Sequence, residues 1–250
     1  MAHYCNPPGP DWESHRAGTS GHPLRTVQVV AAALIPLFPL GTVLLPGSPL
    51  ALHIFEDRYR ALMADLLARP EAERRFGVVA IRSGREVGAD GIGALHEIGC
   101  MATITSVASG SDGTFDIETV GSTRFRVVSL DRERPYLCAT VEWLAEPVGE
   151  VGALKAIVTK RYADYRDAFG ELRGVTLAGP PLPDDARLLS YLVAATVIAD
   201  LPDRQRFLAE VDAAGRLAAE ARWLALESSL VRNLSAVPAG RIINVPSSTN

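Results

Sequence analysis

The hydrophobic pattern between Leu34 and Arg60 changes from extended to helical at Glu56. Proline cannot continue a helix, so the apolar runs before Glu56, which prolines interrupt, are expected to be extended. After Glu56 the apolar residues recur every three or four positions, which places them on one face of a helix that should end before Pro70. The interrupting prolines are Pro36, Pro39, Pro46 and Pro49, and the helical face consists of Tyr59, Leu62, Met63, Leu66 and Leu67.

Five runs downstream of this helix are rich in β-branched or aromatic residues and predict strands. Asp112-Gly113 lies between two of them and predicts a hairpin turn, because this pair tolerates positive φ angles. The region is therefore expected to be a strand meander with one helix inserted early. The predicted strands are Phe76–Ile81, Ile98–Val107, Thr114–Thr119, Phe125–Leu130 and Leu137–Leu144.

After Pro147 the pattern becomes helical. The negative charge of Asp184-Asp185 favours a helix start there, and Asp200 and Pro202 suit the start of the next helix. The predicted helices are Val151–Leu172, Leu188–Ile198, one with Phe207, Leu208 and Val211 on its inner face, and Asp212–Leu234. These changes predict four segments: a flexible extension over 1–33, a strand-rich part over 34–147, a helical part over 148–236 and a tail over 237–250.

Composition and charge narrow the function classes. A net charge of −4 over 250 residues argues against a dedicated binder of DNA, RNA or acidic membranes, since such proteins usually carry a basic excess. Cys5, Cys100 and Cys138 are widely spaced and odd in number, so neither a disulfide framework nor a metal site is expected. Thr26–His53 is long enough to span a membrane, but its prolines and glycines divide it into strand-sized pieces. With no secretory signal, we expect a cytoplasmic protein.

Residues for catalysis are sparse. The chain has no G-x-x-x-x-G-K-[ST] loop for nucleotide phosphates and no G-x-S-x-G nucleophile turn. Its five histidines are not at metal-ligand spacing, so no metal or cofactor is expected. Glu56 and Asp57 could be paired carboxylates, but adjacent helical side chains point apart, and acidic residues at a helix start are explained by capping. The sequence therefore predicts a protein that is not an enzyme.

Several motifs occur in a specific order: PLFPLG at 36–41, IFEDRYR at 54–60, IGCMATI at 98–104, GSTRFRV at 121–127 and PYLCATVE at 135–142. Together they resemble the N-terminal, substrate-binding domain of Lon proteases, and the resemblance covers roughly residues 34–230. It implies an α+β fold in which the strands form a small PUA-like β-barrel with an inserted helix, followed by a C-terminal α-helical bundle.

The resemblance also implies a non-catalytic module that recognises unfolded or client polypeptides. The phosphate loop and Ser-Lys dyad of the Lon ATPase and protease modules do not occur in this sequence, so a role as adaptor for a separate ATP-dependent protease is expected. Asp57, Arg58 and Arg60 are candidates for partner binding, although they could equally form a solvated face. Arg124 and Tyr136 match family motifs, which packing and hydrogen bonding within the barrel would also explain.

Two other classes of function remain open. RNA binding would suit a PUA-like barrel with Arg124, Arg126, Arg132 and Arg134 close in sequence, but neighbouring acidic residues dilute this patch. A small-molecule sensor is suggested by the related barrel of cereblon-type proteins, although the cysteine-rich zinc domain of those proteins does not occur here.

Overall fold

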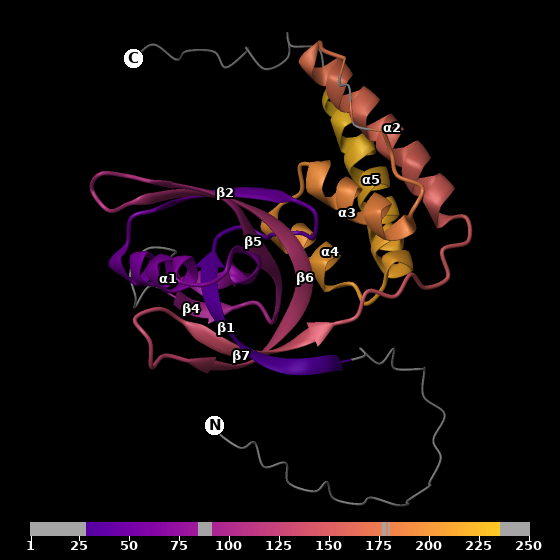
Figure 1. Cartoon of the computed structure of the whole chain (residues 1–250). Helices are drawn as coiled ribbons and strands as arrows, with labels where there is room; N and C mark the ends of the chain where they lie inside the picture. Colours follow the sequence, from indigo (N-terminus) through magenta and orange to yellow (C-terminus); the bar gives the residue numbers. More distant parts are fainter. Residues whose placement is uncertain (1–28, 85–91, 177–178, 180, 236–250) are drawn as a thin grey trace, which may run out of the picture.

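The computed structural model describes residues 29–84, 92–176, 179 and 181–235. One half consists of strands and helix α1 (Asp57–Leu67), and the other consists of helices (Figure 1). The strands are β1 (Val29–Leu40), β2 (Pro49–Ile54), β3 (Arg75–Gly84), β4 (Ile92–Leu95), β5 (Ile98–Ser109), β6 (Phe115–Asp131) and β7 (Cys138–Leu144). The other helices are the short 3-10 turn Glu71–Glu73, α2 (Leu154–Arg173), α3 (Ala186–Thr196), α4 (Leu201–Ala209) and α5 (Ala213–Ser235).

The strands form one mixed sheet in the order β1-β7-β6-β5-β3-β4. β1 also pairs in parallel with β3 through Leu37–Leu40, which closes a ring of hydrogen-bonded neighbours. Antiparallel pairing joins the other neighbours, and β2 lies outside the ring, paired with the first half of β6. The mixed sheet and helices agree with the predicted α+β class.

The two faces of the strands bury separate apolar clusters. The smaller cluster gathers around Phe125 on β6, and two glycines make room for its ring. A Cβ at Gly77 would lie 2.8 Å from the ring, and one at Gly99 would lie 2.5 Å from it. The larger cluster covers the other face and continues into the helical half, from Phe38 on β1 to Leu224 on α5. The strands and the helices therefore share one buried core.

Strand β6 differs from the prediction, which placed two strands over Thr114–Thr119 and Phe125–Leu130. The chain runs through Gly121 without a turn, and the strand extends over 17 residues. A Cβ at this position would lie 2.2 Å from the Leu45 carbonyl oxygen, so glycine is needed here for close backbone approach rather than for a turn. Irregular pairing with β5 between Cys100 and Ala102 marks a β-bulge nearby.

Helix α1 packs on the sheet with the face that its periodicity predicted. Tyr59, Leu62, Met63 and Leu66 are buried, and the Tyr59 ring stacks on Phe38 with 3.9 Å between ring centroids. The expected capping of α1 by an acidic side chain is wrong for Glu56. Glu56 occupies the N-cap position, but its side chain makes no capping hydrogen bond and instead binds Arg58 at 3.0 Å.

In the helical half, α2 and α5 lie side by side, and α3 and α4 pack against α5 (Figure 1). The predicted cap Asp200 is confirmed, since its side chain accepts a hydrogen bond from the backbone of Asp203. The helix start expected from the negative charge of Asp184-Asp185 is also confirmed, and Asp185 caps it by accepting from the backbone of Arg187 and Leu188. Cys100 and Cys138 are buried thiols, as predicted, and burial raises the pKa of Cys100 to about 12. Within the described part of the chain, no helix has the length and apolar character needed to cross a bilayer.

The predicted boundary at residue 34 falls inside β1, which begins at Val29. Residues 1–28 and the predicted tail over 237–250 lie outside the described residues, as does Cys5.

Candidate functional site

A groove of about 480 Å³ lies between the connection of β1 to β2 and α3, together with the segment just before α3. The connection turns tightly at Gly47, whose φ is 78°, and hydrogen bonds from Gly47 N to Gly121 O at 2.8 Å and from Ser48 N to Leu45 O at 3.0 Å hold it. Pro46 and Pro49 restrict the backbone of the wall that the β1–β2 connection forms, because proline fixes its φ angle. The groove is lined by Pro46, Gly47, Ser48, Pro49, Pro181, Pro183, Leu188, Tyr191, Leu192, Ala195 and Thr196.

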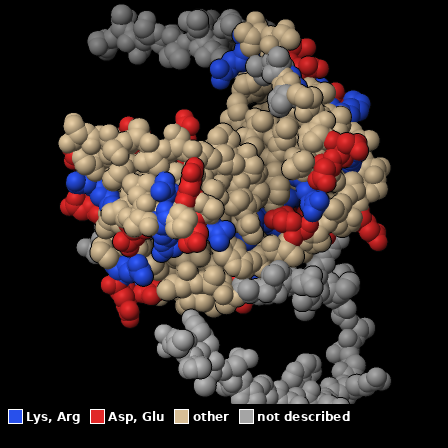
Figure 2. Space-filling model, in the orientation of Figure 1, with Lys and Arg blue, Asp and Glu red and all other residues tan. Residues whose placement is uncertain are grey.

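None of the residues that line the groove carries a charge. Leu188 is 61% exposed, so a large apolar side chain is accessible at the groove. Ser48 is 8% exposed, and its hydroxyl has no hydrogen-bond partner among the described residues. Figure 2 shows that uncharged residues also cover the surface between β2 and α3, while charged side chains lie on other parts of both halves. This surface suits an apolar ligand with a few polar groups.

Arg124, a predicted site residue, lies behind the groove in the interior and joins the two halves. It is 1% exposed, and its guanidinium group forms an ion pair with Glu146. It also donates to two backbone carbonyl groups at the end of α4, Leu208 O at 2.7 Å and Glu210 O at 2.5 Å. Its side chain therefore connects the middle of β6 to the helical half.

A second buried arginine completes this network. Arg216 on α5 donates to Phe207 O at 2.9 Å and to the Tyr191 hydroxyl at 2.8 Å, and its guanidinium lies 3.8 Å from the centre of the Tyr191 ring. The Tyr191 hydroxyl in turn donates to Glu146 at 2.7 Å. Burial raises the pKa of Tyr191, so its hydroxyl keeps the proton that it donates. Tyr191 thus lines the groove and bonds to the network. We call Arg124, Glu146, Tyr191 and Arg216 the arginine network.

Glu220 lies one helical turn after Arg216 and is completely buried. Neither carboxylate oxygen has a hydrogen-bond partner among the described residues. Burial raises the pKa of Glu220 well above its ordinary value, and the nearby Arg216 guanidinium opposes this shift. The carboxyl group is therefore a source of instability whenever it is ionised.

All three predicted site residues on α1 have partners within the protein. Arg60 donates to Gly113 O at 2.9 Å and to Asp57 at 3.1 Å, which ties α1 to the hairpin between β5 and β6. The Arg58 guanidinium lies 4.4 Å from the centre of the Tyr59 ring, and its side chain is 14% exposed. The Asp57 side chain is 97% exposed. These three side chains do not line the groove.

Tyr136 is buried, and its hydroxyl donates to Asp65 on α1 at 2.5 Å and accepts from Arg134 at 3.0 Å. The arginines proposed for RNA binding do not form one basic surface. Arg124 is buried, Arg126 lies 3.8 Å from Glu142 and Arg134 lies 3.3 Å from Asp65.

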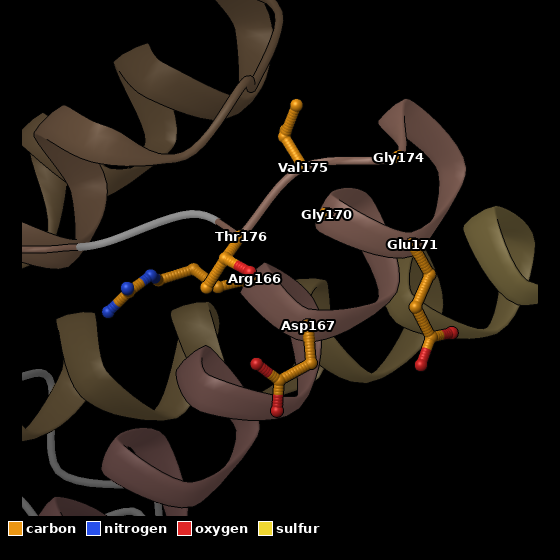
Figure 3. A pocket seen from close by; sticks show the side chains of 7 residues that line it. All are labelled: Arg166, Asp167, Gly170, Glu171, Gly174, Val175 and Thr176. Carbon is orange, nitrogen blue, oxygen red and sulfur yellow. The ribbon is translucent and has the colours of Figure 1, made fainter.

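A second cavity, of about 420 Å³, lies at the end of α2 (Figure 3). Its charged side chains, Arg166, Asp167 and Glu171, point in different directions and do not converge on a common point. It borders Thr176, after which the chain is not described. Within the described ranges, no group of three or more His, Cys, Asp or Glu side chains could hold a metal ion. The groove is therefore the better candidate.

Comparisons with known proteins identify the family to which the chain belongs. The family described as ATP-dependent protease La (LON) substrate-binding domain matches residues 34–225, so the chain belongs to this family. Lon protease 2 of Myxococcus xanthus is 27% identical over 189 residues, which cover 74% of this chain and 22% of that protein. Lon protease 2 of Sorangium cellulosum is 30% identical over 179 residues, which cover 71% of this chain and 21% of that protein. The chain thus spans about a fifth of the length of these relatives.

Solved structures show the same fold. A Lon N-terminal domain protein from Xanthomonas campestris matches with a TM-score of 0.54 and 24% identity, covering 76% of this chain and 98% of that one. The N-terminal domain of Mycobacterium avium complex Lon protease matches with a TM-score of 0.53 and 16% identity, covering 77% and 98%. The fold is therefore that of Lon N-terminal domains.

Sequence reasoning missed the groove and most of the arginine network. One signal was available: Arg216 and Glu220 are four residues apart in an alanine-rich helix, so they share one face. When charged residues share a helix face with many small apolar residues, the face is expected to be buried and the charges to form polar contacts inside the protein. The partners of that contact, Glu146 and Tyr191, come from distant segments that no spacing rule joins.

Proposed function

We propose that this protein is a substrate-recognition module that binds exposed apolar segments of unfolded polypeptides in the groove between Pro46–Pro49 and α3. The observation that carries the proposal is the uncharged lining of the groove, with Leu188 exposed at its edge. Membership of the Lon substrate-binding family supports a polypeptide as the ligand. We further propose that the module acts as an adaptor that delivers clients to a separate ATP-dependent protease.

The size of the groove fits this role. A cavity of about 480 Å³ lies within the range of about 300–1,000 Å³ that ligand sites usually have. Burial of one large aliphatic side chain contributes about 1.5–3 kcal/mol, so two or three such side chains give weak, reversible binding after the ordering cost of the chain. Weak and sequence-tolerant binding suits a module that must release its client.

We also propose the architecture and boundaries that the resemblance implies. The closed ring of strands would be a small PUA-like barrel, and α2–α5 would be the helical bundle that follows it. The parts over 34–147 and 148–236 would be two subdomains that share the large apolar cluster.

A charge placed in the groove tests the proposal. Leu188→Glu should weaken binding of a permanently unfolded test protein, such as reduced and alkylated lactalbumin, by about tenfold, because a carboxylate resists transfer to an apolar contact. The matched control is Leu226→Glu, since Leu226 is 67% exposed on α5 and does not line the groove. Fluorescence anisotropy measures both affinities. Equal affinity of the Leu188 variant and the unchanged protein would contradict the proposal, and so would equal losses in both variants.

The adaptor role needs a separate test. Cross-linking in the source cells, followed by identification of captured proteins and RNA, should recover an ATP-dependent protease together with unfolded clients. Capture of clients in the absence of a protease would leave the groove as a binding site and reject the adaptor role. Enrichment of one discrete RNA would contradict both.

A further inference from the structure

Strand β2 is an edge strand within the described structure. It pairs with β6 through Pro49–Ile54 and Phe115–Val120, and its other side has no strand neighbour. No further backbone–backbone hydrogen bond reaches these six residues from the described chain. In a paired strand, alternate residues turn their N–H and C=O groups away from the neighbour. One row of backbone groups on β2 is therefore available to another extended chain.

This edge lacks the features that usually block pairing. Proteins protect exposed edges with charged side chains, prolines or very short strands. β2 contains no Lys, Arg, Asp or Glu, and its only proline is Pro49 at the first position. His53 is held by Asp116 of the paired strand β6, with 2.7 Å between Nδ1 and Oδ1. By contrast, β4 is an edge of only four residues.

Cavities lie near both ends of β2. The groove borders Pro49 at the start of β2. At the other end, a cavity of about 160 Å³ is lined by Leu52, His53 and Phe55, together with side chains of β1 and α1. Phe55 is 54% exposed there. Six extended residues span about 20 Å, so one peptide lying along β2 reaches both cavities.

We infer that the edge of β2 accepts an extended apolar polypeptide segment as an additional strand, with side chains near its two ends seated in the two cavities. This inference rests on the proposed function and narrows its substrate class. The backbone of β2 offers directional hydrogen bonds that only another extended backbone matches, and the cavities select apolar side chains. Clients would need about six consecutive strand-forming residues without proline, whereas helical and proline-rich segments would be excluded.

Backbone methylation provides a direct test, because it removes hydrogen-bond donors and keeps the side chains. The probe is a fluorescein-labelled, eight-residue peptide of alternating Val and Thr, with two isomers N-methylated on the odd or on the even residues. An added strand turns only one set of its N–H groups toward β2. One isomer should therefore lose about tenfold to hundredfold in affinity, while the other stays within about twofold of the unmethylated peptide.

Hydrogen exchange on the full chain supplies the second readout. Binding of the unmethylated peptide should slow exchange at alternate amides within Leu50–Ile54. Equal affinity of both isomers, without added protection in β2, would overturn strand addition while leaving the groove as the binding site. Binding of no peptide, together with no binding of the unfolded test protein, would overturn the proposed function as well. Concentration-dependent dimerisation that protects the same amides would assign the edge to a second copy of the chain and overturn the inference.

Discussion

Helix α1 and the C-terminal helices both pack against the strands, but the two contacts differ in chemistry. Under α1 the contact is apolar, formed by Phe38, Tyr59, Leu62 and Leu66. The arginine network adds directional bonds from Arg124 and its partners to the contact between β6 and the helical half. Apolar contact is tolerant of small shifts, whereas hydrogen bonds to backbone carbonyl groups fix an angle and a register.

This difference in chemistry suggests that the contact under α1 and the arginine network have separate roles. The contact under α1 stabilises the sheet half mainly through apolar burial, and hydrogen bonds from Arg60 and Tyr136 lie beside it. The arginine network sets the position of α3 relative to β6, and the groove lies between α3 and a loop that is bonded to β6 at Gly121. The polar contact thus joins α3 to the strand that holds the opposite wall of the groove, although burial of its charges limits what it adds to stability.

The strongest test of this comparison removes the arginine at its centre. Arg124→Met should lower the free energy of unfolding by about 3–5 kcal/mol, since Glu146 and two buried carbonyl groups lose a partner. Arg126→Met is the matched control on the same strand, because Arg126 is half-buried and 3.8 Å from Glu142, and should cost less than about 1 kcal/mol. Urea unfolding measures both. Similar losses in the two variants would show that the network has no special role.

The apolar contact should respond to loss of volume. Leu66 is 0% exposed, and Leu66→Ala should cost about 2–4 kcal/mol through lost burial and the cavity that remains. Leu67→Ala, at the partly buried neighbouring position, should cost about 1 kcal/mol. Binding of an unfolded test protein in the groove should change little in either folded variant. A larger loss of binding than of stability in Leu66→Ala would contradict the separation of tasks.

The buried carboxyl group of Glu220 predicts a pH dependence of stability. Burial raises its pKa in the folded state, so the folded protein binds more protons here than the unfolded chain does. The contribution of Glu220 to stability is therefore fully present below its ordinary pKa of 4.5 and is lost as the pH rises toward the folded value.

Glu220→Gln should consequently be more stable than the unchanged protein at neutral pH, by about 1–2 kcal/mol, and the difference should shrink in acid. Thermal unfolding across this pH range measures the effect. Glu227→Gln, two turns further along α5 and partly exposed, serves as the control and should show a smaller change. A constant difference at all pH values would mean that ionisation of Glu220 is not the cause.

The smallest effect is expected for the hydrogen bonds of Tyr136, which lie beside the apolar contact of α1. Tyr136→Phe removes the hydroxyl that bridges Asp65 and Arg134 and should cost about 1 kcal/mol, as for an ordinary hydrogen bond. Differential scanning calorimetry resolves such a change. A loss as large as that of Arg124→Met would place Tyr136 in a more important polar contact than its geometry indicates.

Local patterns predicted much of the fold. The buried face of α1, the caps at Asp185 and Asp200 and most strand cores follow from periodicity and turn chemistry, which depend on near neighbours in the chain. The continuity of β6 through Gly121 could not be predicted, because the reason is the close approach of Leu45 from a distant segment.

The candidate site was harder to predict for the same reason. Motif matching drew attention to Arg124 and Tyr136, and packing with hydrogen bonding was one expected explanation for both, but the helices to which they bond emerge only in three dimensions. The groove joins a proline-rich loop to a helix about 140 positions later, and no local rule connects them. Exposed charges near Asp57 were easy to notice, although surface charges usually have no special role.

Strand β6 has a mechanical consequence. Its first half holds β2 along six residue pairs, and its second half carries Arg124, which is bonded to the helices. If a protease pulled on a chain paired along β2, the load would pass in shear through β6 and reach the helical half at Arg124. Hydrogen bonds loaded in shear share the force, so the six residue pairs between β2 and β6 would resist a pull along the strand together.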